Sequence, residues 1–273
     1  MELKGKKITY LLVDEYGRVN PADVQEAITD KTILISIMAA NNEIGTIASI
    51  NEIGKIANDH EVLFHTDAAQ AAGHIPLDLK KMHIDLMSIS GHKIYGPKGI
   101  GILAIKGINP KKKVSPLIFG GGHERGIRSG TLNVPGIVGI GAALEIANKE
   151  MKEENKRYLS WTSQMLTSFQ EATNGTVKLN GHPTERLAHN LNVCFPGIES
   201  KALIHSLRND VAISTGSACT TTKVEPSHVL RAIGLPDAMT HSAVRFGLWR
   251  GNTENEIKSA IEKITSSTKV MIK

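Results

Sequence analysis

The feature that most constrains this chain is a short apolar run that ends in a turn bearing one lysine. The run Leu86–Ile89 is mainly apolar, as in a strand buried on both faces of a parallel sheet, and Ser90, Gly91 and His92 then break it. Lys93 is therefore predicted to lie just past the carboxyl end of a strand, where ligands bind in open α/β sheets. Its amine can react with an aldehyde. An ordinary turn lysine is the commoner explanation of Gly-His-Lys taken alone.

Strand and helix patterns alternate through the first half of the chain. Apolar stretches predict strands at 8–13, 32–39, 62–65 and 99–105. Helical spacing predicts one helix that Asn20-Pro21 opens and another from Ile50. Such alternation is typical of an α/β fold, a mostly parallel sheet with helices on both faces. We expect this large domain to occupy residues 1–150.

Polar residues follow three of these predicted strands. Asn42 follows the strand predicted at 32–39, Asp67 and Gln70 follow the one at 62–65, and Ser90, His92 and Lys93 follow the apolar run at 86–89. Because the carboxyl ends of parallel strands meet at one edge of a sheet, we expect these side chains to lie close together. Asp67 is the only acid that the pattern places there, suited to pairing with a protonated ring nitrogen. A helix N-cap is the alternative role for Asp67.

A glycine-dense segment, 120–131, contains two arginines and ends in Thr131. Its backbone amides and side chains are suited to a phosphate cradle. A flexible loop at a subunit boundary is nearly as good an interpretation. No Gly-Lys-Ser/Thr follows a glycine-rich turn, which disfavours a nucleotide site of the Walker type.

The second half of the chain predicts a smaller α+β domain over residues 151–273. A long helix at 134–171 leads into it. Predicted strands are 177–179, 190–195, 211–214 and 243–248, and predicted helices are 200–208, 227–233 and 254–264.

The two cysteines have different surroundings. Cys194 alternates with apolar neighbours in a predicted strand, so we expect a buried and inert thiol. Cys219 lies in the small, polar stretch 214–222, where an exposed thiol can act as a nucleophile. A free surface cysteine without a function is the alternative.

Composition disfavours several classes of protein. Two cysteines do not make a disulfide framework, no signal-like apolar core follows Met1, and no stretch reaches the roughly 20 apolar residues of a membrane span. A net charge of +5 is spread along the chain and only 4% of residues are aromatic, which disfavours nucleic-acid binding. We therefore expect a cytoplasmic protein with no membrane or direct nucleic-acid partner.

Taken together, the motifs resemble the cysteine desulfurases of the NifS/IscS type, which belong to the class V aminotransferase-like, fold-type I pyridoxal phosphate enzymes. The motifs are NEIG at 42–45, DAAQ at 67–70, SGHKIYGPKG at 90–99, HERGIRSGT at 123–131 and GSAC at 216–219. Their order and spacing are far more specific than any one of them, and the resemblance runs over essentially the whole chain.

The resemblance implies a role for each candidate residue. Lys93 would hold pyridoxal 5'-phosphate covalently, Asp67 would pair with its ring nitrogen, and Asn42 and Gln70 would bind its phenolic oxygen side. Ser90 and His92 resemble phosphate ligands, and Thr131 resembles the residue that reaches the phosphate in the partner subunit of a homodimer. Arg245 resembles the clamp for the substrate carboxylate, beside which Asn42 also contacts substrate, and Cys219 matches the nucleophile.

The implied reaction is removal of sulfur from L-cysteine. Lys93 would move the α-proton, the Cys219 thiolate would attack the substrate sulfur, and alanine would leave. The persulfide on Cys219 would then serve iron–sulfur cluster assembly or another sulfur transfer through an acceptor protein. The resemblance implies no metal site, although Cys219 would be the residue to contact a transferred iron–sulfur cluster.

One departure from the family pattern keeps alternatives open. Members of the family have an earlier segment with further phosphate-binding hydroxyls and a histidine that stacks on the cofactor, and residues 1–16 do not match it. The chain would then be a fragment or be completed by a second polypeptide, and alone it is expected to bind the cofactor weakly and turn over poorly. The alternatives are an inactive interaction module and another lyase or aminotransferase on the same fold, such as a selenocysteine lyase.

Overall fold

The computed structural model describes residues 5–107, 114–215 and 227–272. It divides into two compact units, each considered by itself below. The β1–β4 unit comprises residues 24–39 and 49–151, and the β5–β8 unit comprises residues 1–23, 40–48 and 152–273. Residues 40–48 thus group with the C-terminal half of the chain. The predicted domains, 1–150 and 151–273, stay a prediction.

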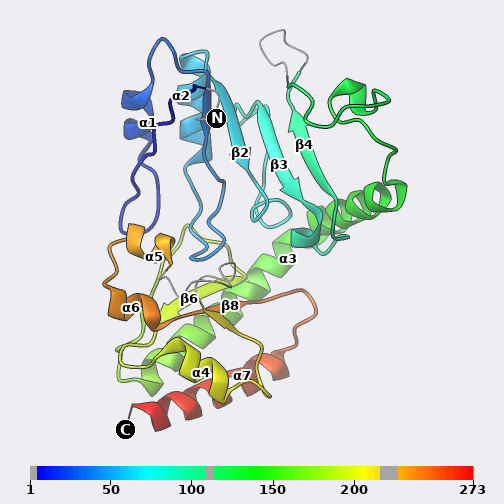
Figure 1. Cartoon of the computed structure of the whole chain (residues 1–273). Helices are drawn as coiled ribbons and strands as arrows, with labels where there is room; N and C mark the ends of the chain where they lie inside the picture. Colours follow the sequence, from blue (N-terminus) through cyan, green and yellow to red (C-terminus); the bar gives the residue numbers. More distant parts are fainter. Residues whose placement is uncertain (1–4, 108–113, 216–226, 273) are drawn as a thin grey trace. The chain divides into compact units, whose positions relative to one another are not determined.

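The β1–β4 unit is built on a four-stranded mixed sheet. Its strands follow the order β1 (Leu34–Ser36), β2 (Leu63–Asp67), β3 (Leu86–Ser90) and β4 (Gly101–Ile105). The first three strands are parallel and β4 is antiparallel to β3, so the arrows of β2 and β3 point the same way in Figure 1 and that of β4 points back. The link from β3 to β4, residues 91–100, is shorter than the dozen or more residues that a parallel crossover needs.

Helix α2 (Ile50–Asp59) packs against β2 in this unit. Ile50, Ile53 and Ala57 recur on one face and are buried, which is the amphipathic spacing of a surface helix. A Cβ on Gly54 would lie 2.0 Å from the carbonyl oxygen of Met82, so only glycine allows the helix to approach this closely. The predicted helix at this position is confirmed.

The β5–β8 unit contains an antiparallel sheet and most of the apolar core. The sheet has the order β5 (Lys178–Leu179), β6 (Asn190–Cys194), β8 (Ala243–Gly247) and β7 (Ser214–Thr215). The helices with residues in the unit are α1 (Pro21–Ala27), α3 (Val134–Ala172), α4 (Ser200–Ser206), α5 (His228–Ala232), α6 (Asp237–His241) and α7 (Glu254–Met271), of which α1 and α3 extend into both units.

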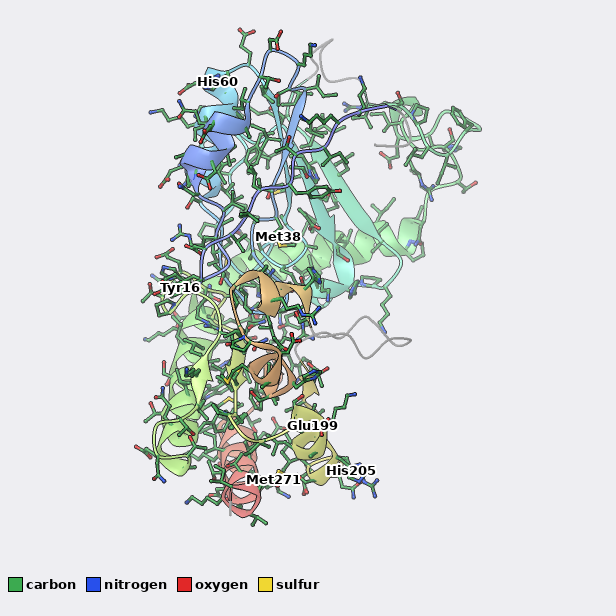
Figure 2. The ribbon with its side chains drawn as sticks, turned by 60° about the vertical axis from the view of Figure 1, so that its left-hand side comes forward. Tyr16, Met38, His60, Glu199, His205 and Met271 are labelled. Carbon is green, nitrogen blue, oxygen red and sulfur yellow. The ribbon has the colours of Figure 1, made fainter. Side chains whose placement is uncertain are left out.

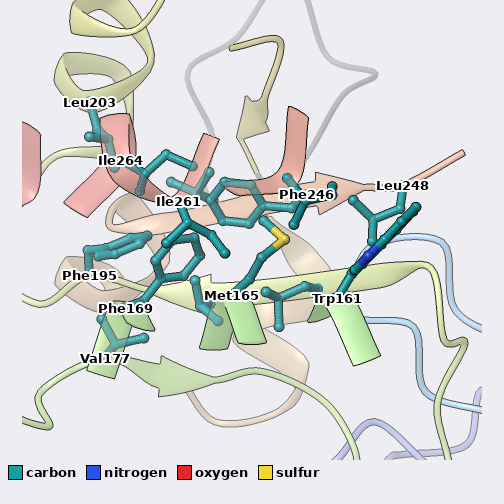
Figure 3. Packing of buried hydrophobic residues seen from close by; sticks show 14 of the residues in the cluster. Trp161, Met165, Phe169, Val177, Phe195, Leu203, Phe246, Leu248, Ile261 and Ile264 are labelled. Atoms are coloured by element: carbon teal, nitrogen blue, oxygen red, sulfur yellow. The ribbon is translucent and has the colours of Figure 1, made fainter. Parts of the chain in front are cut away.

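A large cluster of buried apolar side chains lies in this second unit (Figure 3). Phe169 on α3 is fully buried and lies with its ring centroid 5.2 Å from that of Phe246 and 5.6 Å from that of Phe195. Ile261 and Ile264 of α7 close the cluster from the helix side. The core therefore lies directly beneath β8, the strand that carries Arg245.

The helices at the surface of this unit have identifiable ends. Helix α7 begins with a capping box, in which the Thr253 hydroxyl accepts from the Glu256 N–H and the Glu256 carboxylate accepts from the Thr253 N–H. Figure 2 labels Met271, the last residue of this helix. It also labels Glu199, the N-cap residue of the neighbouring helix α4, and His205 within α4. Such caps satisfy backbone groups that the helix itself leaves unpaired.

One predicted element is wrong. Residues 8–13 form no strand, and Tyr10 and Leu12 are 78% and 85% exposed. A strand needs a neighbouring backbone to complete its hydrogen bonds, and local β propensity does not supply one. The short helix α6 was not predicted from the sequence.

Candidate functional site

The backbone around Lys93 is held tightly, while its side chain is exposed. Lys93 lies in a 3-10 turn, Gly91–Ile94, directly after β3, and Ile94 is buried against α3. A Cβ on Gly91 would lie 2.9–3.0 Å from atoms of Pro97 and Ile100, so the turn requires glycine there. The turn ends at Tyr95, which has φ 65°. The sheet edge thus positions the lysine through its main chain.

His74 adds a contact to this turn that sequence reasoning missed. Its side chain is buried, and its Nε2 lies 3.3 Å from the Lys93 carbonyl oxygen. Its ring meets that of Tyr95 edge-on, with centroids 6.3 Å apart. The sequence offered only a weak signal, a histidine four residues after Gln70.

Asp67 ends β2 at the same edge of the sheet where β3 ends. The register pairs Asp67 with Ser88, so Ser90 and the Lys93 turn follow directly on the neighbouring parallel strand. The Asp67 carboxylate accepts a hydrogen bond of 2.8 Å from the Ala69 N–H and remains exposed. No helix begins at Asp67, so the structure does not support the N-cap alternative. Gln70, in the turn that follows, is half-buried.

Hydrogen-bonded polar side chains on β1, β2 and β3 form a row next to this edge of the sheet. The His65 Nδ1 is 2.8 Å from the Ser36 hydroxyl, and its Nε2 is 2.9 Å from the Ser88 hydroxyl. Burial lowers the pKa of His65, and the nearby charge of Asp67 opposes this shift. His65 lies two residues before Asp67 on one strand, hence on the same face. That spacing could have identified His65 from the sequence.

Ser90 and His92 lie beside one another at the end of β3. The Ser90 hydroxyl is 3.0 Å from the His92 Nδ1, which leaves the far ring nitrogen of His92 able to face a ligand. Together with Lys93 and Asp67, this edge offers an amine, a carboxylate and a hydroxyl–imidazole pair. The set fits a small molecule with an aldehyde, a basic ring nitrogen and a phosphate.

Thr131 lies at the end of the glycine-dense segment and is exposed. Within this segment, Ser129 is buried and its hydroxyl accepts from the Gly122 N–H at 3.3 Å. The Arg128 guanidinium donates to the Gly130 carbonyl oxygen at 3.3 Å. The segment is therefore closed on itself by local contacts. The phosphate role of Thr131 stays a prediction.

Asn42 and Arg245 meet in the β5–β8 unit. Arg245 is half-buried on β8, and its Nη1 donates to the Asn42 carbonyl oxygen at 2.8 Å. Its Nε makes a longer contact, 3.4 Å, with the Ser214 hydroxyl on β7. The turn at Asn42 is itself closed by Asn41, whose side-chain oxygen accepts from the N–H groups of Glu43 and Ile44 at 2.8 and 3.1 Å.

The two cysteines differ in what the structure describes. Cys194 is fully buried, lies 3.2 Å from the Asn180 side-chain nitrogen, and donates to the Met239 carbonyl oxygen. Burial raises the pKa of its thiol, which makes it a poor nucleophile, as the sequence predicted. Cys219 lies outside the described residues.

The structure therefore groups the candidate residues into two sets. One set belongs to the β1–β4 unit and the other to the β5–β8 unit. The first consists of Asp67, Gln70, Ser90, His92, Lys93 and Thr131, and the second of Asn42 and Arg245. In the described part of the chain no three metal-binding side chains come together. None of the described helices has the length and hydropathy that crossing a bilayer requires.

Comparisons with known proteins point to one group of enzymes. The model of the aminotransferase class-V family matches residues 1–259. The chain is 48% identical over 266 residues to the cysteine desulfurase IscS of Methanosarcina thermophila, covering 97% of this chain and 64% of that protein. The corresponding protein of Ehrlichia chaffeensis is 47% identical, with 98% and 65% covered. The chain thus spans a little under two thirds of the length of these curated relatives.

Solved structures agree with this grouping. A NifS-like protein superimposes with a TM-score of 0.87 at 36% identity, covering 97% of this chain and 69% of that one. A NifS-like protein from Rickettsia africae gives a TM-score of 0.84 at 28% identity, covering 94% and 68%. The expected α/β architecture, that of the fold-type I pyridoxal phosphate enzymes, is confirmed.

Proposed function

Because this chain belongs to the aminotransferase class-V family, we propose that it is a cysteine desulfurase, which takes sulfur from L-cysteine and releases L-alanine. One observation carries the proposal. Lys93 follows β3 at the sheet edge where Asp67 ends the neighbouring parallel strand, in a chain 48% identical to a named cysteine desulfurase.

Cysteine desulfurases and class V aminotransferases depend on pyridoxal 5'-phosphate. When bound, this group supplies an electron-withdrawing ring. The residues at the edge fit it: Lys93 would join its aldehyde, Asp67 would face its ring nitrogen, and Gln70 would face its phenolic oxygen. The likeness to the family adds Asn42, from the other unit, as a further partner of the phenolic oxygen. The phosphate would be bound by Ser90 and His92, with Thr131 reaching it from the partner subunit of a homodimer.

Four residues would act on the substrate. Arg245 and Asn42 would hold cysteine, the arginine through its carboxylate. The Lys93 amine would take the α-proton and return it. The Cys219 thiolate would attack the substrate sulfur, so that the S–S bond of a persulfide forms as the carbon–sulfur bond of the substrate breaks and its electron pair stays with the carbon.

The destination of the sulfur is a further part of the proposal. We propose delivery from Cys219 to an acceptor protein, such as an iron–sulfur cluster scaffold. The likeness to relatives named cysteine desulfurase supports the release of sulfur on which this delivery depends. We propose a homodimer that works in the cytoplasm. These statements rest on the likeness to longer proteins.

The test is direct. The purified chain is titrated with pyridoxal 5'-phosphate and L-cysteine, alanine is quantified, and persulfide on Cys219 is sought by mass spectrometry. We expect weak cofactor binding, because Asp67 and Lys93 are exposed in this chain and their contacts compete with water. We expect alanine and persulfide in equal amounts during the first turnover.

Two variants decide between this function and its alternatives. Lys93→Ala should abolish both products, and Cys219→Ser should abolish the persulfide. Full alanine production by Cys219→Ser would indicate another lyase on the same fold. No product at saturating cofactor, with the chain folded, would indicate an interaction module and would overturn the proposal.

A further inference from the structure

A buried acid, Glu43, adjoins the candidate substrate-binding turn and has no role in the chemistry proposed above. Glu43 is only 5% exposed, although a carboxylate is costly to remove from water unless it is hydrogen-bonded. The Ser227 hydroxyl donates to its Oε2 at 2.6 Å and so gives the buried carboxyl group a hydrogen-bond partner. Glu43 is thus a buried acid held by a specific hydrogen bond to Ser227.

Two neighbouring strands of one sheet, β6 and β8, bind the main chain of the turn at Glu43. Asn192 on β6 lies directly opposite Arg245 on β8. The Asn192 side-chain amide donates to the Glu43 carbonyl oxygen at 3.0 Å, and Arg245 donates to the Asn42 carbonyl oxygen at 2.8 Å. Neighbouring side chains of the sheet thus bind successive carbonyl groups of one turn. Asn190 adds a third contact, 3.3 Å, to the Glu43 carbonyl oxygen.

Ser227 links the turn to a helix as well. It is the N-cap of α5, and its hydroxyl oxygen accepts from the Leu230 N–H at 3.3 Å. The same hydroxyl group therefore accepts from the helix and donates to Glu43. The Glu43 side chain ties the turn to α5, while its carbonyl oxygen ties the turn to β6.

The direction of the Arg245 fork depends on this turn. An arginine grips a carboxylate best when two of its N–H groups point at the ligand in parallel, and an anchored guanidinium loses less freedom on binding. In the structure the Asn42 carbonyl oxygen anchors the Arg245 guanidinium. Glu43 is the next residue after Asn42 in the chain. A shift of the turn would rotate the fork.

We propose that Glu43 is a positioning residue: through Ser227 it locks the Asn42 turn against β6 and β8, and so sets the guanidinium of Arg245 for the carboxylate of the amino-acid substrate. The substrate part of this inference rests on the proposed function. The positional part does not, because it concerns contacts within one unit.

The kinetic test compares Glu43→Ala with Glu43→Gln in the cofactor-loaded protein. Alanine lacks an acceptor for Ser227, whereas the glutamine side-chain oxygen keeps one. Glu43→Ala should raise KM for L-cysteine about tenfold and change kcat less than about threefold, since the lost interaction concerns binding. Glu43→Gln should restore KM to within about threefold of the unaltered chain. An unchanged KM in a folded Glu43→Ala variant would overturn the proposal.

Ser227→Ala provides a second, milder variant in case Glu43→Ala does not fold. It should raise KM in the same direction, and the double variant should be no worse than Glu43→Ala alone, because both remove one interaction. The matched control is Thr253→Ala, which removes the N-cap of α7 instead. It should cost similar stability and leave KM unchanged. Equal KM values in the two cap variants would contradict the proposal.

Hydrogen–deuterium exchange separates this inference from the proposed function. The N–H groups of Asn41 and Gly45 are bonded within the turn, to the carbonyl oxygens of Thr46 and Asn41. Their exchange should accelerate about tenfold or more in Glu43→Ala and remain slow in Glu43→Gln. If the unaltered chain makes no alanine, the proposed function fails, and the exchange rates alone decide the positional claim. Unchanged exchange in Glu43→Ala refutes it.

Discussion

The two sets of candidate residues are held in different ways. In the β1–β4 unit, Asp67 and Lys93 have exposed side chains, and parallel strand register and a glycine-dependent turn place their main chains. In the β5–β8 unit, Arg245 is half-buried above an aromatic core and bonded to the main chain of Asn42. Asp67 and Lys93 can therefore be altered with little loss of stability. The second cannot be separated from the folding of its unit.

The largest expected effect is a loss of catalytic activity without a loss of stability. Lys93→Ala should lower alanine formation by about a thousandfold or more, because it removes the group that moves the proton and joins the cofactor. The melting temperature should hardly change, since the side chain is exposed. Activity and thermal unfolding measured on one preparation test both statements.

Lys98→Ala is the matched control for this variant. Lys98 is also exposed and lies in the same link between β3 and β4. It should retain full activity. A large loss of stability in Lys93→Ala that is absent from Lys98→Ala would contradict this prediction, because it would show that the Lys93 side chain also stabilises the fold.

The second prediction concerns the apolar core beneath Arg245. Phe169→Ala should lower the free energy of unfolding by about 3–5 kcal/mol, because it leaves a cavity against Phe195 and Phe246. Phe246 is the neighbour of Arg245 on β8, so substrate binding should weaken as well. Urea unfolding followed by tryptophan fluorescence measures the change. Leu159→Ala, on the same helix and 49% exposed, should cost far less.

A third prediction tests whether the turn at Lys93 depends on glycine. Gly91→Ala should cost about 1–3 kcal/mol, because the added methyl group would overlap atoms of Pro97 and Ile100. It should also weaken cofactor binding by moving Lys93. Gly141→Ala is the control, since nothing lies within 4 Å of its added Cβ in α3 and alanine favours a helix. Equal stability of the two variants would show that the turn tolerates a side chain.

The smallest expected effect is the pH dependence that His65 contributes. Its folded pKa is lowered, so the unfolded chain binds the proton more readily. Stability from this group is complete above the unfolded pKa of about 6.5 and is lost as pH falls below it. His65→Gln should flatten the fall in melting temperature below pH 6.5. A fall that His65→Gln leaves unchanged would contradict this prediction.

Much of the set in the β1–β4 unit could be predicted from the sequence. Apolar runs that end in polar residues placed Asp67 and Ser90 at the ends of β2 and β3, and glycines marked the Lys93 turn. These are local signals, set by side-chain alternation and backbone freedom over a few residues. The same local signals failed at residues 8–13, where no backbone partner exists in the described chain.

By itself the sequence determined the α/β class, the strand ends and the inert character of Cys194. Only the tertiary structure decided that Asn42 groups with Arg245, that Glu43 is buried against Ser227, and that β4 runs antiparallel. The reason is the distance along the chain. Asn42 and Arg245 are 203 residues apart, and no periodicity within a window of sequence encodes a hydrogen bond between them.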